Sequence, residues 1–157
     1  GVRGRCAADS ARRGYNNESL SVGKTENEEL ARMTIVLNGD DYILGQMMKQ
    51  MDKRIDVKKI KRVEEDAVSR ELLLIKVKTD AATRSQVLEI SQIFRAKVVD
   101  ASPEATILEL TGKPMKLDGF VTMLMPYGVM ELARTGVTSI SRGKSTIKDE
   151  TDYKEKI

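Results

Sequence analysis

Thr34-Ile-Val-Leu-Asn-Gly39 and Ile107-Leu-Glu-Leu-Thr-Gly112 are two versions of one pattern, a short strand that stops at a glycine, and they lie 73 residues apart. Beyond each glycine the apolar residues recur at i, i+3, i+4 and i+7, which is one face of an amphipathic helix. They are Leu44, Met47, Met48 and Met51 in the first copy and Leu117, Phe120, Val121 and Leu124 in the second. A repeat of this length is too long for a solenoid unit and suits a small α/β domain, so the sequence predicts two similar domains in tandem.

The second half of the chain predicts the order strand, helix, strand, strand, helix, strand. Residues 70–78 are rich in aliphatic side chains, as a central strand is, and Asp80 is a candidate N-cap for the helix that follows. Further strands are predicted at 98–99, 106–110 and within 129–140. The second helix begins at Pro114, where a missing N–H costs nothing, and ends at Pro126-Tyr-Gly128.

The first half predicts the same order without its opening strand. A helix is expected within residues 1–13 and strands at 20–22 and 33–37, joined by a polar hairpin loop. A helix capped by Asp40 and a closing strand at 55–60 follow. The predicted fold class is therefore α+β, with two tandem ferredoxin-like (βαββαβ) domains. We expect domains at 1–66 and 67–143 and a charged, mobile tail at 144–157.

Composition argues against nucleic acid as a partner. The chain of 157 residues carries 27 basic and 24 acidic side chains, a net charge of +3, and it has only two phenylalanines, four tyrosines and no tryptophan. Platforms for base stacking are therefore scarce. The basic run at 58–62 is followed at once by acidic residues 64–66, which favours a solvated strand end and linker.

The sequence offers no catalytic or metal site. Histidine is absent, which removes the commonest general base and metal ligand, and Cys6 is the only cysteine, so no disulfide framework exists. No nucleotide-binding or nucleophile motif occurs. The clustered carboxylates lie at predicted loops and helix starts, where capping and solubility explain them better than catalysis does. No apolar run approaches the ~20 residues that span a bilayer, so we expect a soluble protein with no membrane association.

One turn has residues suited to recognition, Arg12-Arg-Gly-Tyr-Asn-Asn-Glu-Ser19. Its glycine places backbone N–H groups beside Asn16, whose carboxamide can meet both the ammonium and the carboxylate of an amino acid. An ordinary Asx-type turn explains the same residues.

Five segments, in order and in register, resemble the small, regulatory subunit of acetolactate synthase (acetohydroxyacid synthase). The likeness covers about residues 11–143. The segments are Arg13-Gly-Tyr-Asn-Asn-Glu-Ser-Leu-Ser-Val-Gly23, Ala31-Arg-Met-Thr-Ile-Val36, Arg70-Glu-Leu-Leu-Leu-Ile-Lys-Val77, Ile93-Phe-Arg-Ala-Lys-Val-Val-Asp100 and Glu131-Leu-Ala-Arg-Thr-Gly-Val137.

This resemblance implies an N-terminal ACT domain followed by an ACT-like C-terminal domain, in agreement with the repeat. It implies a non-catalytic protein that binds a large catalytic subunit, raises its activity and confers feedback inhibition by valine or another branched-chain amino acid. Thiamine diphosphate, Mg²⁺ and FAD would belong to the large subunit, and this chain would carry no cofactor. The expected location is the cytoplasm in a bacterium and the plastid stroma in a photosynthetic eukaryote.

The resemblance also implies an effector site between two paired ACT domains, and hence a homodimer. The asparagine of the family's R-G-Y-N turn corresponds to Asn16 in this chain, and the glycine that closes the family's first loop corresponds to Gly1. Asn17 stands beside them, at a position where isoleucine is usual. The family's acidic-Asn-Glu-x-Gly loop and first strand would precede Gly1. Residues 3–10 also depart from the family, with Arg3, Cys6, Asp9 and Ser10 at large apolar positions.

Two other interpretations of the sequence remain. An amino-acid-sensing ACT module of another regulator, such as the effector half of a transcription factor, needs a helix-turn-helix partner that this chain lacks. An enzyme in its own right lacks histidine and any cofactor fingerprint.

Overall fold

The computed structural model describes residues 19–37 and 56–153. The chain divides into two compact units, one of Gly1–Val68 with Ser139–Ile157 and one of Ser69–Thr138. Strands and helices both occur in the described residues, which confirms the α+β class.

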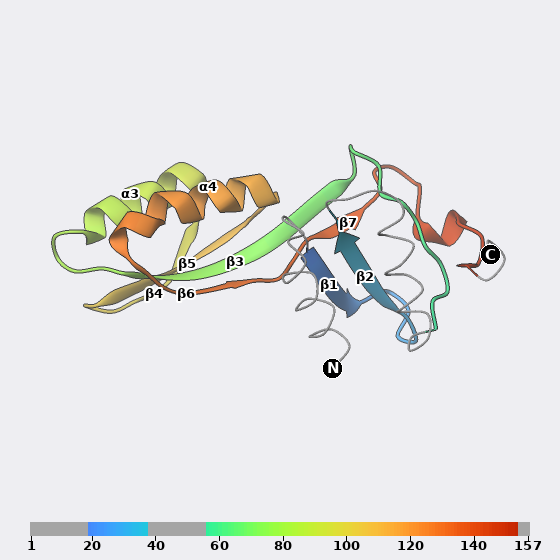
Figure 1. The fold of residues 1–157 in the computed structure, drawn as a ribbon, viewed down its shortest axis with the longest axis horizontal. Helices are drawn as coiled ribbons and strands as arrows, with labels where there is room; N and C mark the ends of the chain where they lie inside the picture. The colour runs from blue at the N-terminus through green and yellow to red at the C-terminus, as the bar shows by residue number, and fades with distance from the viewer. Residues whose placement is uncertain (1–18, 38–55, 154–157) are drawn as a thin grey trace. The chain divides into compact units, whose positions relative to one another are not determined.

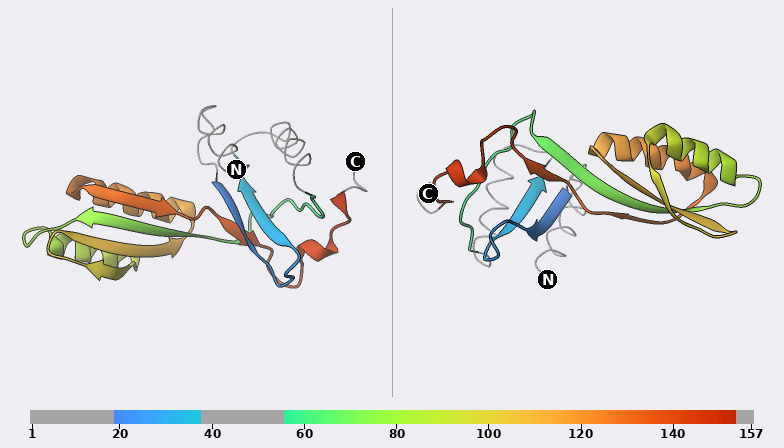
Figure 2. Two further views of the ribbon diagram at one scale, coloured as in Figure 1. Left: turned by 90° about the horizontal axis from the view of Figure 1, so that it is seen from below. Right: turned by 180° about the vertical axis from the view of Figure 1, so that it is seen from behind.

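The second unit has the complete predicted order. Its elements are β3 (Val68–Lys78), α3 (Arg84–Phe94), β4 (Lys97–Ala101), β5 (Ala105–Gly112), α4 (Pro114–Leu124), the 3-10 turn η1 (Met125–Tyr127) and β6 (Val129–Arg134). The strands form an antiparallel sheet in the order β4-β5-β3-β6, and β7 (Thr138–Ile140) also pairs with β3. Both helices lie on one face of this sheet and leave the other without a helix (Figures 1 and 2).

The core follows from the alternation of side chains along β3. Leu73, Ile75 and Val77 point toward the helices and are fully buried. Their neighbours in the core are Val87, Ile90, Leu108, Leu110, Leu117, Phe120 and Leu124. Three of the four positions predicted for the second amphipathic helix are therefore buried, and the fourth, Val121, packs partly buried against them. The equivalent helix of the first copy, which includes Leu44 to Met51, lies outside the described residues.

The two helices begin differently. Pro114 is the first residue of α4, as predicted. The N-cap of α3 is Thr83 and not Asp80, because Asp80 closes a separate turn just before the helix. The Asp80 carboxylate accepts hydrogen bonds from the backbone N–H groups of Thr83 and Ala82, at 3.0 and 2.9 Å, and these bonds lower the pKa of Asp80.

The described part of the first unit contains the predicted hairpin. Strands β1 (Ser19–Lys24) and β2 (Ala31–Val36) are antiparallel and pair residue for residue. In the loop between them the Thr25 hydroxyl hydrogen-bonds the carbonyls of Asn27 and Leu30. The Asn27 carboxamide accepts from the backbone N–H of Glu29, so the loop is an Asx-type turn fixed by its own side chains.

The strand predicted at 55–60 is wrong for its described residues, because 56–60 form no strand. The alternation of Ile55-Asp-Val-Lys-Lys-Ile60 is typical of a strand, but a strand also needs a neighbour. In the second unit the closing strand β6 pairs with the opening strand β3, and the described residues of the first unit include no such opening strand. One backbone hydrogen bond, from Tyr153 N–H to the Lys58 carbonyl at 2.8 Å, holds the segment instead.

The residues that follow β7 pack with the first unit. The 3-10 turn η2 (Ile147–Asp149) is closed by Thr146 and Asp149 in a capping box. Lys59 Nζ donates to the Lys148 carbonyl and Lys61 Nζ to the Ser145 hydroxyl, each at 2.8 Å. The limits 1–66, 67–143 and 144–157 stay predictions.

We expect Phe120→Ala to be the most damaging truncation in the second unit. The ring is fully buried, and its centroid lies 5.2 Å from that of Phe94, so its removal loses apolar burial and leaves a cavity worth about 3–5 kcal/mol of unfolding free energy. Urea unfolding of the full chain, followed by circular dichroism, measures this loss. Met115→Ala on the same helix is the control, since Met115 is 84% exposed. Equal midpoints for the two variants would contradict this description of the core.

Candidate functional site

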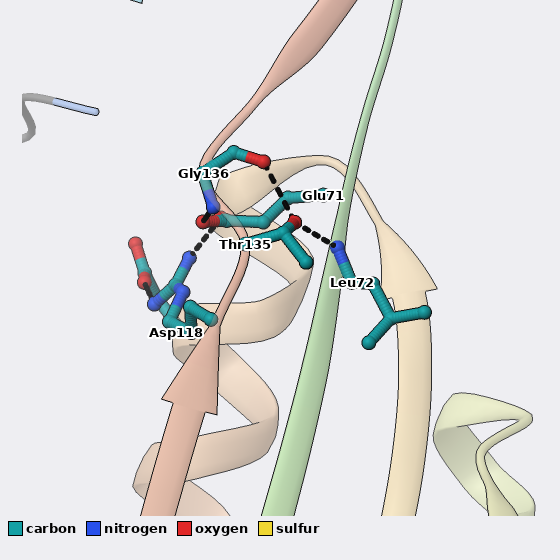
Figure 3. A network of polar contacts seen from close by, with 6 residues as sticks. Glu71, Leu72, Asp118, Thr135 and Gly136 are labelled. Atoms are coloured by element: carbon teal, nitrogen blue, oxygen red, sulfur yellow. Dashed lines mark hydrogen bonds and ion pairs between the residues drawn. The ribbon is translucent and has the colours of Figure 1, made fainter. Parts of the chain in front are cut away.

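A cluster of charged side chains joins three elements at one end of the second sheet (Figure 3). Arg134, the last residue of β6, makes ion pairs to Glu71 of β3 and Asp118 of α4, each with an N–O distance of 2.6 Å. Glu71 has the same orientation on β3 as the buried Leu73 and Ile75, and only 5% of it is exposed. A carboxylate at a core position requires a cation and hydrogen-bond donors, and Arg134 supplies the cation.

The residues after Arg134 complete the cluster. The second oxygen of Glu71 accepts from the Gly136 N–H at 3.1 Å. The Thr135 hydroxyl accepts from the Leu72 N–H, and the Thr135 N–H donates to the Leu72 carbonyl, both at 3.1 Å. Gly136 has a φ of 83°, in the left-handed region that favours glycine, so the chain turns at this point without strain. These bonds fix where the pairing of β3 and β6 ends.

The electrostatics of the cluster favour the charged form of Arg134. Burial acts to lower the pKa of the Arg134 guanidinium, but its hydrogen bonds and Coulombic attraction to Glu71 and Asp118 outweigh burial, and the pKa is raised. Neither a hydroxyl nor a thiol nucleophile takes part in the ion pairs. The arrangement is a structural brace between the sheet and α4.

Both segments that form the cluster were identified in the sequence, but their contact was not predicted. Glu71 lies in Arg70-Glu-Leu-Leu-Leu-Ile-Lys-Val77 and Arg134 in Glu131-Leu-Ala-Arg-Thr-Gly-Val137. The signal was present, because a strand with Leu73 and Ile75 inward must also place Glu71 inward. Asp118 gave no comparable signal, since it lies on an ordinary exposed helix position.

The basic run at 58–62 is partnered within the first unit. Lys58 pairs with Asp56 at 2.8 Å, and the hydrogen bond to Asp56 raises the pKa of Lys58. Lys61 pairs with Glu64 at 3.4 Å, and Glu64 in turn accepts from the Ser141 hydroxyl. The charges of Lys58 and Lys61 are thus offset by neighbouring carboxylates.

The three predicted effector residues, Gly1, Asn16 and Asn17, lie outside the described residues. The first described residue after the Asn16 turn is Ser19, where β1 begins. Among the described residues no group of three or more His, Cys, Asp or Glu side chains is arranged to hold a metal ion. No helix in the described part of the chain has both the length and the hydropathy needed to cross a bilayer.

Comparison with known proteins shows two adjacent family matches. A family model described as the small subunit of acetolactate synthase matches residues 70–143, and one described as an AHAS small subunit-like ACT domain matches residues 8–59. The chain belongs to the acetolactate synthase small subunit family. The first match contains the whole Glu71–Arg134–Asp118 cluster, and the second contains Asn16 and Asn17.

Individual relatives agree over most of the chain. The acetolactate synthase small subunit of Mycolicibacterium smegmatis is 51% identical over 144 residues, which cover 91% of this chain and 85% of that protein. The probable small subunit of Archaeoglobus fulgidus is 44% identical over 143 residues, with 91% and 90% covered. The crystal structure of the small subunit from Thermotoga maritima superposes with a TM-score of 0.73 at 36% identity, covering 92% of this chain and 91% of that one. The tandem ferredoxin-like fold and the family expectation are confirmed.

We expect Glu71→Ala to destabilise this small subunit by about 3 kcal/mol. The change leaves Arg134 with one partner fewer and the Gly136 N–H without its acceptor. Glu71→Gln keeps an acceptor oxygen but removes the charge, so its unfolding free energy should lie between those of the unchanged chain and of Glu71→Ala. Chemical denaturation measures both, with Glu89→Ala on the exposed side of α3 as control. A Glu71→Ala variant as stable as the control would show that the cluster does not brace the sheet.

Proposed function

We propose that this chain is the regulatory subunit of an acetolactate synthase. It binds the thiamine-diphosphate-dependent catalytic subunit, raises the activity of that subunit and makes it sensitive to valine or another branched-chain amino acid. The observation that carries this proposal is the presence, in one chain and in this order, of an AHAS small subunit-like ACT domain and the C-terminal region of the acetolactate synthase small subunit. That pairing disfavours the ACT module of a different regulator, which would have no reason to carry the second region.

The chemistry of the chain supports a regulatory role without catalysis. The sequence has no histidine, and the carboxylates of Glu71 and Asp118 are both engaged by Arg134. Thiamine diphosphate, Mg²⁺ and FAD are assigned in this proposal to the catalytic subunit. This chain would supply binding surface and effector recognition.

The effector site is proposed at the contact of two ACT domains. Asn16 would reach across the dimer to the ammonium and carboxylate of the amino acid, with Gly1 closing the loop of the other copy and Asn17 beside it. The hairpin β1–β2 begins at Ser19, directly after these residues in the sequence, and six residue pairs join its two strands. A zwitterionic ligand is well matched by an amide together with backbone N–H groups, because both donors and acceptors are needed.

The first test of the proposal is activity. The purified chain should not convert pyruvate to acetolactate, and when it is added to a matching large subunit the rate of that enzyme should rise. Steady-state assays with the chain alone, the large subunit alone and both together measure this, with heat-denatured chain as the control. Turnover by the chain alone, or an unchanged rate in the mixture, would contradict the assignment.

The second test concerns Asn16. In a chain that carries the family's first strand and loop ahead of Gly1, Asn16→Ala should weaken valine binding by about 1.5–3 kcal/mol, or about ten- to a hundredfold, because ligand charges lose a buried partner. Activation should persist, since it depends on the surface presented to the large subunit. A valine titration of activity measures the shift. Asn27→Ala is the matched control, because the Asn27 carboxamide accepts from the Glu29 N–H within its own hairpin loop. Equal inhibition curves for all three proteins would place the effector site elsewhere.

A further inference from the structure

The second unit keeps all of its methionines at the surface. The structure describes every residue of Ser69–Thr138, and this unit contains four methionines. Their exposed fractions are 84% for Met115, 48% for Met123, 60% for Met125 and 58% for Met130. The buried cluster beneath the two helices consists instead of leucine, isoleucine, valine and phenylalanine. Methionine usually fills gaps in protein cores, so the packing of this unit does not explain four thioethers in water.

The four methionines lie in one stretch of the chain, from α4 through η1 to β6. Met115 and Met123 belong to α4, and Met125 begins η1. Met130 is the residue of β6 that the register with β3 skips at its bulge. A bulged residue has no direct neighbour on the opposite strand, which leaves its side chain open to solvent.

An exposed thioether is a substrate for peroxides. The sulfur attacks one oxygen of hydrogen peroxide, the O–O bond breaks, and the products are methionine sulfoxide and water. The sulfur loses two electrons and the peroxide gains them. The sulfoxide is polar, so it disrupts a core when it forms at a buried position. At an exposed position the same change removes no packing.

We propose that Met115, Met123, Met125 and Met130 are sites of reversible S-oxidation by peroxide, and that the second unit accepts this modification without unfolding. The residues that join the sheet to the helices contain no sulfur, so the oxidant leaves the core as it is. The modification turns exposed apolar side chains polar while the fold is retained. It requires no second protein and is independent of the proposed regulatory role.

The exposed positions also permit repair. Methionine sulfoxide reductases return the sulfoxide to the thioether, with one enzyme for each sulfoxide epimer. A dithiol supplies two electrons and two protons, and the products are the thioether, water and a disulfide. The reductase needs access to the sulfur, as the oxidant does, and all four side chains are at least half as exposed as Met115.

Oxidation of the full chain by hydrogen peroxide, followed residue by residue by peptide mass spectrometry, tests the proposal. A Cys6→Ser background removes the only thiol. The matched control is Leu117→Met, which nearly conserves volume and places a further thioether at a fully buried position of α4. In that variant each of the four methionines should gain oxygen at least about tenfold faster than position 117, because susceptibility follows exposure. A methionine among the four that reacts no faster than position 117 would overturn the proposal.

Hydrogen exchange then tests whether the oxidised unit stays folded. Peptides from β3 and β5 should keep the amide protection of the unoxidised chain when all four sulfurs carry oxygen. Because the measurement is made on individual peptides, it separates the second unit from any effect of the methionines in the first. In the Leu117→Met chain, oxidation at position 117 should coincide with loss of this protection. Loss of protection in the chain with Leu117 intact would show that the unit does not tolerate the modification, and the proposal would be wrong.

Reversibility is tested on the oxidised chain with the two stereospecific methionine sulfoxide reductases and dithiothreitol. The mass of each of the four peptides should return to that of the unoxidised chain, with the protection of β3 and β5 unchanged. Omission of the reductases is the control, since dithiothreitol alone should leave the sulfoxides in place. Sulfoxide that persists at any of the four positions after both enzymes would contradict a reversible site there.

Discussion

The alternation of side chains along β3 is the constraint on which the second unit depends. This strand pairs with β5 on one side and β6 on the other, so its inward residues define the core for the whole sheet. Leu73, Ile75 and Val77 are fully buried beneath α3 and α4. The same alternation places Glu71 inward, and the sheet is stable with a buried carboxylate only because Arg134 and the Gly136 N–H meet it. One strand therefore determines both the core and the brace.

The elements that sequence patterns predicted correctly are those whose signal is local. The aliphatic run 70–78, the apolar spacing of Leu117, Phe120 and Leu124 and the proline at 114 each depend on residues close together in the chain. The predicted hairpin at 20–37 is confirmed for the same reason, because Thr25 and Asn27 fix the loop by themselves. The family followed from five short segments in order, which the matches at 8–59 and 70–143 bear out.

The elements that were missed depend on partners distant in sequence. Residues 56–60 alternate like a strand, but in the second unit the equivalent closing strand exists because β3 lies beside it. A two-residue alternation predicts which face of a strand is apolar, but it does not predict whether a neighbouring strand is present to pair with it. The brace of Glu71, Asp118 and Arg134 was missed because its members are 16 to 63 residues apart. Of the proposed effector residues, Gly1 and Asn17 rest on the family resemblance alone, and Asn16 rests on the resemblance together with the donors and acceptor of its carboxamide.

The two units pair their charged side chains in different ways. In the described part of the first unit, Lys58 pairs with Asp56 and Lys61 with Glu64, and Lys61 and Glu64 also hydrogen-bond the hydroxyls of Ser145 and Ser141. In the second, Arg134 pairs with the buried Glu71 and with Asp118 of α4. An exposed ion pair such as that of Lys58 and Asp56 contributes little to stability, whereas a buried carboxylate that loses its cation is costly, so the brace contributes more to the fold of its unit than the exposed pair does to its own.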